Sequence, residues 1–370
     1  MARIARVEIF APDEVAIVHV MNRTVRRCFL LGDDPVSGKN HDHRKVWIDQ
    51  QLTQQARHFG IDLLCQAIMS NHVHLVLRSR PDVVKEWSNT EIARRWLMLC
   101  PIRRDENRQP AEPTEFEMNS IVNDKDKLAV IRSRLSDISW WMRLLSQNIA
   151  QRANREDQEI GKFWQARYRA VRLLDETALL ACAAYVDLNP IRAAVAETIE
   201  GSLFTSAQKR ASDLQACHGQ SADTATRETK NASDFGEPAA ASSKNSSSRH
   251  LAPVDLNERT EETGPNANQQ GVRCSNKGFL RISTAEYLSL LDWTARQQRI
   301  GKAGTTPKNL APLFTRLQIS AEVWSHLVKD FGRLFSVVAG KPRMIDEHKS
   351  RTKAHRYRAR LRVRELLTTG

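Results

Sequence analysis

The chain has 370 residues, of which 41% are hydrophobic, and its 56 Lys and Arg against 43 Asp and Glu give a formal net charge of +13. This length suits two domains or one domain with appendages, and the charge favours nucleic acid over an anionic membrane surface as partner. No run of about 18 apolar residues occurs, which argues against a transmembrane helix, and the first residues lack the apolar segment of a signal peptide. The six cysteines form no C-x-x-C pair and are typical of buried thiols in a reducing compartment.

The hydrophobic pattern of residues 1–210 predicts strands and helices that alternate along the chain. Apolar runs predict strands over 14–21, 61–69, 71–77 and 168–174. Apolar residues at helical spacing predict helices over 42–59, 83–99 and 125–154, and Asp175 can cap a further helix. Three prolines in the polar stretch 101–120 indicate a surface insertion. This β-α-β-β-α order, with hairpins, predicts an α+β domain with a largely antiparallel, ferredoxin-like sheet.

The composition changes after residue 210. Residues 211–277 are rich in Ser, Ala, Asn and Glu and have few large apolar side chains, which predicts a disordered linker. Residues 278–340 predict a small helical module, and residues 341–370 a basic helical tail. Because the linker would isolate the first block, removal of the chain after about residue 275 is expected to leave a folded core.

Two histidines alternate with one hydrophobic residue in the segment Ser70-Asn71-His72-Val73-His74-Leu75-Val76-Leu77. Residues i and i+2 of a strand point to the same face, so His72 and His74 would lie side by side. Two adjacent imidazoles form the first half of a divalent-metal site. The same pattern also fits one histidine buried in the core and one exposed to solvent.

A metal site of this kind needs a third ligand and a reacting group, and the segment Ala184-Tyr185-Val186-Asp187-Leu188-Asn189-Pro190 offers both. On a helix, Tyr185 and Asn189 are four residues apart and share one face. Pro190 places the end of that helix near Asn189. A phenol and an amide that project together could face the histidine pair across a cleft, although a core tyrosine and a helix-capping asparagine would give the same pattern.

A third stretch, Gly161-Lys162-Phe163-Trp164-Gln165-Ala166-Arg167-Tyr168, lies between these two segments, and the strand Val18-His19-Val20-Met21-Asn22-Arg23 precedes all three. With these motifs in this order, residues 10–210 resemble the single-tyrosine HUH transposases, in the bacterial REP-associated branch. The resemblance implies a ferredoxin-like core that carries the histidine pair on a central strand and the tyrosine on a following helix.

The resemblance also implies a chemistry. His72, His74 and Asn189 would bind Mg²⁺ or Mn²⁺, and Tyr185 would attack the scissile phosphate of single-stranded DNA to give a 5′-phosphotyrosine bond and a free 3′-hydroxyl. The implied partner is single-stranded DNA with hairpin or palindromic repeats, bound by a monomer or a homodimer. We therefore expect a DNA transposase of the cytoplasm, associated with the nucleoid and not with a membrane.

The residues expected to contact DNA are Trp164, Arg167, Arg169, Arg356, Arg358, Arg360 and Arg362. The tryptophan would stack on a base, and the arginines would bind phosphates. A core tryptophan, surface arginines and a solvated basic helix are the alternative interpretation of the same residues.

Two rival assignments and one rival function remain open from the sequence. His41 and His43 form a second His-x-His, at the start of a helix, where side chains two residues apart diverge. Tyr168 is the other tyrosine of the first block and lies in an Arg-rich strand. The rival function is a domesticated, non-catalytic nucleic-acid-binding protein with the same fold.

Overall fold

The computed structural model describes residues 9–11, 13–228, 246–256, 266–297, 309–352 and 359–368. Its centre is a sheet formed, within these ranges, by β1 (Ile17–Arg23), β2 (Ile61–Ile68), β3 (His72–Ser79), β4 (Arg169–Leu173) and β5 (Val338–Ala339). The strand order is β2-β3-β1-β4-β5, with antiparallel neighbours except for the parallel pair β4 and β5. The predicted α+β class is confirmed.

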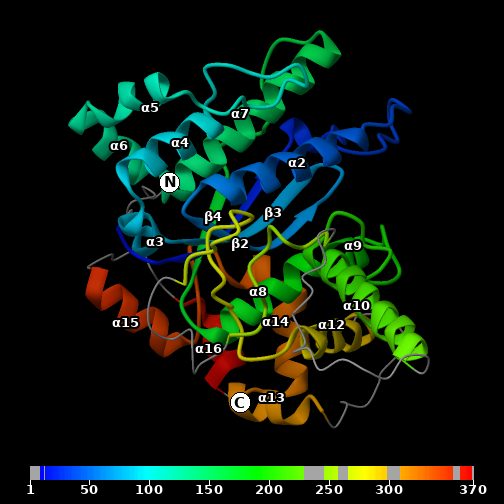
Figure 1. The fold of residues 1–370 in the computed structure, drawn as a ribbon. Coiled ribbons are helices and arrows are strands. Elements are labelled where there is room, and N and C mark those ends of the chain that lie inside the picture. The colour runs from blue at the N-terminus through cyan, green and yellow to red at the C-terminus, as the bar shows by residue number, and fades with distance from the viewer. Residues whose placement is uncertain are drawn as a thin grey trace.

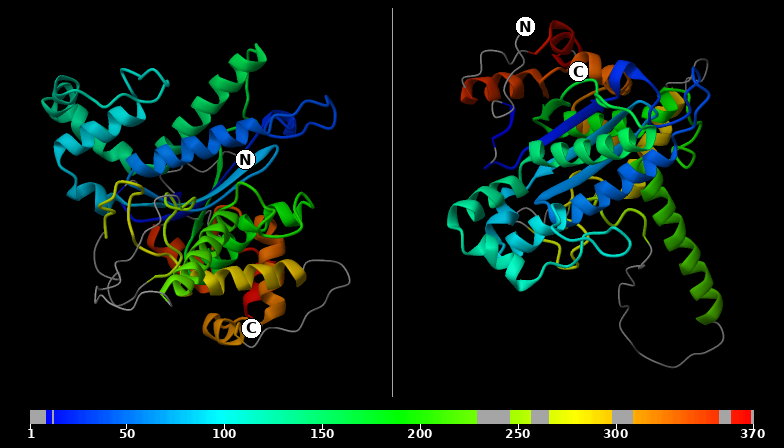
Figure 2. Two further views of the ribbon diagram at one scale, coloured as in Figure 1. Left: turned by 45° about the vertical axis from the view of Figure 1, so that its right-hand side comes forward. Right: turned by 90° about the horizontal axis from the view of Figure 1, so that it is seen from above.

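Helices cover both faces of the sheet (Figures 1 and 2). The helices above it in Figure 1, here called the upper layer, are α2 (His43–His58), α4 (Asn89–Leu99), α5 (Glu115–Val122), α6 (Lys125–Leu135) and α7 (Ile138–Asp157). The helices below it, here called the lower layer, are α8 (Glu176–Asp187), α9 (Asn189–Arg192), α10 (Ser206–Glu228), α12 (Thr284–Gln297), α13 (Ala311–Leu317) and α14 (Ala321–Leu334). Further helices in the described ranges are η1 (Val25–Arg27), α3 (Pro81–Glu86), α15 (Pro342–Thr352) and α16 (Leu361–Thr368).

Two of the expected long helices are each divided into two, at a residue whose short polar side chain caps the second helix. The range 83–99 becomes α3 and α4 because Ser88 caps the second helix by accepting a hydrogen bond from the backbone of Glu91. The range 125–154 becomes α6 and α7 because Asp137 caps α7 in the same way, through the backbone of Ser139. Within the expected surface insertion, Thr114 forms a capping box that starts α5.

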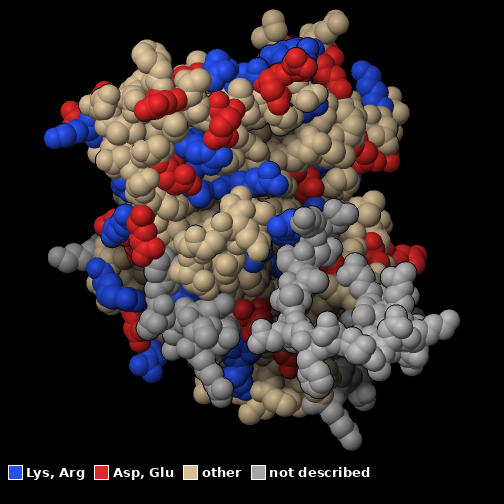
Figure 3. Space-filling model, in the orientation of Figure 1, with Lys and Arg blue, Asp and Glu red and all other residues tan. Residues whose placement is uncertain are grey.

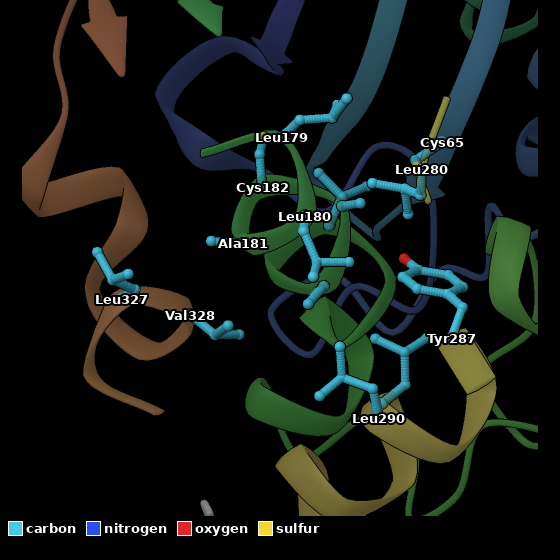
Figure 4. Close-up of a cluster of buried hydrophobic side chains, with 14 of the residues drawn as sticks. Cys65, Leu179, Leu180, Ala181, Cys182, Leu280, Tyr287, Leu290, Leu327 and Val328 are labelled. Atoms are coloured by element: carbon cyan, nitrogen blue, oxygen red, sulfur yellow. The ribbon is translucent and has the colours of Figure 1, made fainter. Parts of the chain in front are cut away.

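Helix α8 lies at the centre of the lower layer and is buried on almost every side. Asp175 caps it by accepting a hydrogen bond of 2.8 Å from the backbone of Ala178. Its apolar side chains pack between Cys65 of β2, Tyr287 and Leu290 of α12, and Leu327 and Val328 of α14 (Figure 4). A helix that is apolar on all sides needs this enclosure, so α8 depends on helices from the C-terminal part of the chain.

The described part of the expected linker is ordered against this core. Helix α10 continues to Glu228, and the backbone of Ala252 donates to Leu63 of β2 at 2.9 Å. Asp62 of β2 accepts bonds from the backbone and hydroxyl of Ser275. A few such anchors order a segment whose average composition is polar, so the structure differs here from the expected linker and from an isolated C-terminal module. Residues 229–245 and 257–265 lie outside the described ranges.

No helix in the described ranges is long and apolar enough to cross a membrane. On the face shown in Figure 3, Lys and Arg side chains are interspersed with Asp and Glu. The positive charge of the chain is therefore not gathered into one patch on that face.

Candidate functional site

The two histidines of β3 lie on the lower face of the sheet. Val73 and Leu75 point into the upper core, whereas His72 and His74 lie on the opposite face with ring centroids 4.9 Å apart. His74 is buried and His72 is half-buried. The alternation of β3 therefore places the two imidazoles side by side, as strand geometry requires.

A third histidine, His19 of β1, joins this pair. Its Nε2 lies 2.8 Å from Nδ1 of His74, and the two rings stack with centroids 5.1 Å apart. On the other side, Nδ1 of His72 lies 2.6 Å from the side-chain oxygen of Asn71. Each imidazole of β3 therefore has its Nδ1 engaged by a neighbour and its Nε2 directed elsewhere.

All three imidazoles are neutral at neutral pH. Burial lowers the pKa of His72 to about 4, with a further contribution from the Arg23 cation. Burial lowers the pKa of His19 to about 3 and that of His74 well below its usual value. Neutral imidazole is the form of histidine that binds metal ions.

Tyr185 lies directly beside the histidines. It is the half-buried residue near the end of the otherwise buried helix α8, and its ring meets those of His74 and His19 edge-on at centroid distances of 5.5 and 6.0 Å. The guanidinium of Arg192 lies 4.2 Å from the centre of the same ring, a cation–π contact. The phenol is thus held between two imidazoles and a cation.

Asn189 also reaches the pair, from the helix that follows. Leu188 ends α8, and Asn189 begins the short helix α9, with Pro190 in its first turn. The side-chain nitrogen of Asn189 lies 3.5 Å from Nε2 of His72. Tyr185 and Asn189 are therefore on two consecutive helices rather than one, yet both face the histidines.

Of these side chains, His19, His74, Tyr185 and Arg192 line a hollow of about 790 Å³ on the lower face, here called the cleft, whereas His72 and Asn189 are not among its lining residues. Its cationic lining residues, among those described, are Arg23, Arg27, Arg169, Arg192, Lys329 and Arg333. One carboxylate, that of Asp330, lines it with them. Such an excess of cations attracts a polyanion and concentrates it at Tyr185.

One wall of the cleft comes from α14, which the sequence reasoning assigned to a separate module. Phe331 packs against the ring of Tyr185 at a centroid distance of 5.6 Å. Gly332 faces the phenol so closely that a methyl group there would lie 3.0 Å from the hydroxyl oxygen. Lys329 and Arg333 flank these two residues in the lining.

The residues expected to contact DNA separate into four groups. Arg169 lines the cleft, whereas Trp164 and Arg167 line a second hollow elsewhere. Arg356 and Arg358 lie outside the described ranges. Arg360 and Arg362 are exposed, and Arg360 donates to the backbone carbonyl of Arg333 beside the cleft.

The rival residues lie away from the cleft. Tyr168 is buried on the upper side, with its hydroxyl 3.1 Å from that of Ser139. His43 forms a 2.7 Å contact with Glu156 at the start of α2. Neither Tyr168 nor His43 lines the cleft.

Sequence reasoning missed His19, Arg192 and the wall formed by α14. His19 carries a signal in hindsight, because it alternates with Met21 and Arg23 on one face of β1. However, this alternation points to the site only once β1 and β3 are known to be neighbouring strands. Within the described ranges, no three His, Cys, Asp or Glu side chains converge as a metal-binding group, so a metal here would also use the amide of Asn189 or oxygens of a substrate.

No protein-family model matches the chain. No curated protein matches its sequence either. Among solved structures, a REP-associated tyrosine transposase bound to a REP hairpin is similar, with a TM-score of 0.32 and 11% identity, over 56% of this chain and 82% of that chain. At this TM-score the likeness supports no conclusion about fold or function.

Proposed function

We propose that this chain is a metal-dependent transposase that cleaves and rejoins single-stranded DNA, with Tyr185 as the nucleophile. The observation that carries the proposal is the position of the Tyr185 ring, 5.5 Å from His74 at the wall of a basic cleft. A phenol, two neutral imidazoles and an amide together supply a nucleophile and a ligand set for phosphoryl transfer. The antiparallel order β2-β3-β1-β4 supports the ferredoxin-like core that this function implies.

The donor set fits a divalent cation. Both imidazoles of β3 are neutral, and the contacts of their Nδ1 atoms with Asn71 and His19 leave Nε2 of each for a ligand. The amide of Asn189 can present its oxygen by rotation about the last side-chain bond. We assign His72, His74 and Asn189 to Mg²⁺ or Mn²⁺, which when bound would polarise the scissile phosphate.

The proposed reaction is an exchange of two bonds at phosphorus. The phenol oxygen of Tyr185 loses its proton to solvent in the cleft and bonds to phosphorus, while the bond from phosphorus to the 3′-oxygen breaks and that oxygen takes up a proton. The products are a 5′-phosphotyrosine and a free 3′-hydroxyl. Since the covalent bond conserves the energy of the cleaved one, a different 3′-hydroxyl can reverse the step and join two strands.

The cations around Tyr185 hold the DNA for this step. Arg192 lies over the phenol ring, and Arg169 and Arg23 lie on the neighbouring strands of the cleft. Positive charge fixed at the phosphate stabilises the charge that develops there during transfer. Hairpin or palindromic single strands remain the expected substrate, and a monomer or homodimer in the cytoplasm, associated with the nucleoid, is the expected setting.

A covalent adduct tests the proposal. The full chain is incubated with labelled DNA hairpins that carry randomised single-stranded flanks, in Mg²⁺ or Mn²⁺, and resolved on a denaturing gel. We expect an adduct that Tyr185→Phe abolishes and that the matched variant Tyr168→Phe retains. His74→Ala should lose the adduct while it keeps most of its DNA binding, which phosphate contacts dominate.

Two outcomes would contradict the assignment. An adduct that survives Tyr185→Phe and vanishes in Tyr168→Phe would move the nucleophile to the upper face. Tight DNA binding without any adduct in either metal would instead identify a non-catalytic nucleic-acid-binding protein.

A further inference from the structure

A second hollow, of about 600 Å³, is lined by α7, which belongs to the upper layer, and by residues 161–168. Its walls combine aromatic rings with cations, and no Asp or Glu is among the described residues that line it. The side chains that carry the argument are Trp140, Arg143, Lys162, Trp164, Arg167 and Tyr168. Aromatic rings beside Arg and Lys are the combination that holds unpaired bases of single-stranded nucleic acid.

Two aromatic walls of this hollow, Trp164 and Tyr168, are held by hydrogen bonds. The indole N–H of Trp164 donates to the carbonyl of Ser146 at 2.8 Å, and the side-chain amide of Asn22 donates to the Ser146 hydroxyl at 3.0 Å. The hydroxyl of Tyr168 lies 3.1 Å from that of Ser139. Because these side chains are already oriented, binding of a stacking ligand would cost little side-chain conformational entropy.

The charges of the hollow select an anionic ligand. The guanidinium of Arg143 lies 4.6 Å from the ring centre of Trp140, and Lys162 and Arg167 are exposed at the rim. Three cations without a lining carboxylate match the phosphate that accompanies each base of a nucleic-acid strand.

The hollow and the cleft lie on opposite sides of the end of β1. Asn22 lines the hollow, whereas its neighbours Met21 and Arg23 line the cleft, because successive residues of a strand point to opposite faces. The backbone of Gln165 donates to the carbonyl of Arg23 at 2.8 Å, which holds the loop of the hollow at this strand end. The cleft and the hollow are therefore lined by adjacent residues at the same strand end.

We infer that the second hollow binds an unpaired nucleobase, with its phosphate, from the same DNA strand that occupies the cleft. The identity of this strand rests on the proposed function. Trp140 and Trp164 provide the stacking surfaces, and Arg143 and Arg167 contact the phosphate. A base bound in the hollow would thereby set which phosphate of the strand lies at Tyr185, at a fixed number of nucleotides from that base.

Abasic substitution tests this inference in Tyr185→Phe protein, which leaves the DNA intact. The probe is a DNA hairpin with oligothymidine flanks, in which one flank position at a time lacks its base. We expect one position at which base removal weakens binding about five-fold or more. Trp140→Ala should weaken binding of the intact probe by a similar factor and remove the sensitivity at that position.

The matched control is Trp47→Ala. Trp47 is also half-buried and stacked on an arginine, Arg152, at 3.8 Å, but it lines neither the cleft nor the hollow. This variant should keep the abasic sensitivity. If Trp140→Ala fails to fold, Arg143→Gln and Arg167→Gln serve instead, and both should lower affinity and the salt dependence of binding.

The results separate this inference from the proposed function. A Tyr185-dependent adduct without any abasic position coupled to Trp140 would overturn the base site and leave the function standing. Coupling to Trp140 without an adduct in the unsubstituted chain would support the base site and reject the function. Competition by thymidine monophosphate as effective as that by the probe would show a free-nucleotide site and overturn the link to the strand.

Discussion

The two faces of the sheet differ in the kind of side chain that they carry. Toward the upper layer, β1 and β3 present Val18, Val20, Val73 and Leu75, all buried in one apolar core. Toward the lower layer, the same two strands present three histidines, Met21 and Arg23. One face of the sheet is thus used for stability and the other for a polar site, which lower-layer helices then enclose.

The C-terminal helices α12 and α14 belong to the lower layer alone, where they enclose the helix that carries the candidate nucleophile. Helices α12 and α14 cover α8, which carries Tyr185, and α14 also forms part of the cleft. The described C-terminal helices therefore complete the lower layer. Each of the following experiments tests this difference between the faces.

Truncation after residue 282 should have the largest effect. It would remove six buried side chains that pack on or near α8, namely Tyr287, Leu290, Leu291, Trp324, Leu327 and Phe331. Each contributes roughly 1.5–3 kcal/mol when buried, and the total stability of a domain is typically about 5–15 kcal/mol. We expect an unfolded or aggregated product by circular dichroism and size-exclusion chromatography. A soluble monomer with an unchanged melting temperature would show that the lower layer does not need these helices.

Gly332→Ala should affect chemistry more than stability. The added methyl group would lie 3.0 Å from the Tyr185 hydroxyl, so the phenol must shift by a few tenths of an ångström. Alanine also favours the helix over glycine by roughly 1 kcal/mol, which offsets part of this strain. We expect adduct formation to slow about ten-fold, with little change in the melting temperature.

The Tyr185→Phe background provides the control for Gly332→Ala. Without the hydroxyl, the methyl group meets no oxygen, so Gly332→Ala should stabilise this background more than it stabilises the unsubstituted chain. Equal changes in both backgrounds would mean that α14 does not press on the nucleophile.

The double substitution Lys329→Gln and Arg333→Gln should weaken DNA binding, by a smaller factor than that by which Gly332→Ala slows adduct formation. Both side chains line the cleft from α14 and are exposed. Each lost phosphate contact should lower the log–log slope of affinity against salt by roughly 0.7 for a single strand. Arg343→Gln, at an exposed position on α15, is the matched control and should leave the slope unchanged. An unchanged slope in the double variant would remove α14 from the DNA-binding surface.

Local periodicity was enough to predict much of this site. The alternation of β3 places His72 beside His74, and the spacing of Tyr185 and Asn189 correctly predicts that both face the histidines, although Asn189 begins α9 instead of ending α8. Contacts between distant segments were not accessible in this way. His19 meets His74 only because β1 pairs with β3, and the amphipathic pattern of α14 does not state that α8 is its partner.

Trp164 and Arg169 show that local periodicity also fails to predict the positions of residues that are close in the sequence. Both were expected to contact DNA, yet Trp164 lines the second hollow and Arg169 lines the cleft on the other face, because the chain enters β4 between them. The face that a side chain occupies depends on the register of that strand against β1, which the sequence alone does not specify.

The smallest expected effect concerns acid stability on the upper side, at His58 of α2. Burial lowers the pKa of His58 to about 3, and the cations of Arg95, Arg94 and Arg57 contribute. In the unfolded chain the imidazole takes up a proton below about pH 6.5, whereas in the folded chain it stays neutral down to about pH 3. The unfolded state therefore binds more protons in this window, and stability falls as the pH is lowered through it.

For one such histidine the loss between pH 7 and pH 5.5 is about 1 kcal/mol. His58→Gln should remove this part of the acid sensitivity, measured as a smaller fall of the urea midpoint between these two pH values. Buried histidines of the lower face leave the remainder, because their folded-state pKa values are also depressed. An identical fall in the variant would mean that His58 is protonated in the folded chain, and acid sensitivity would then belong to the lower face rather than to both.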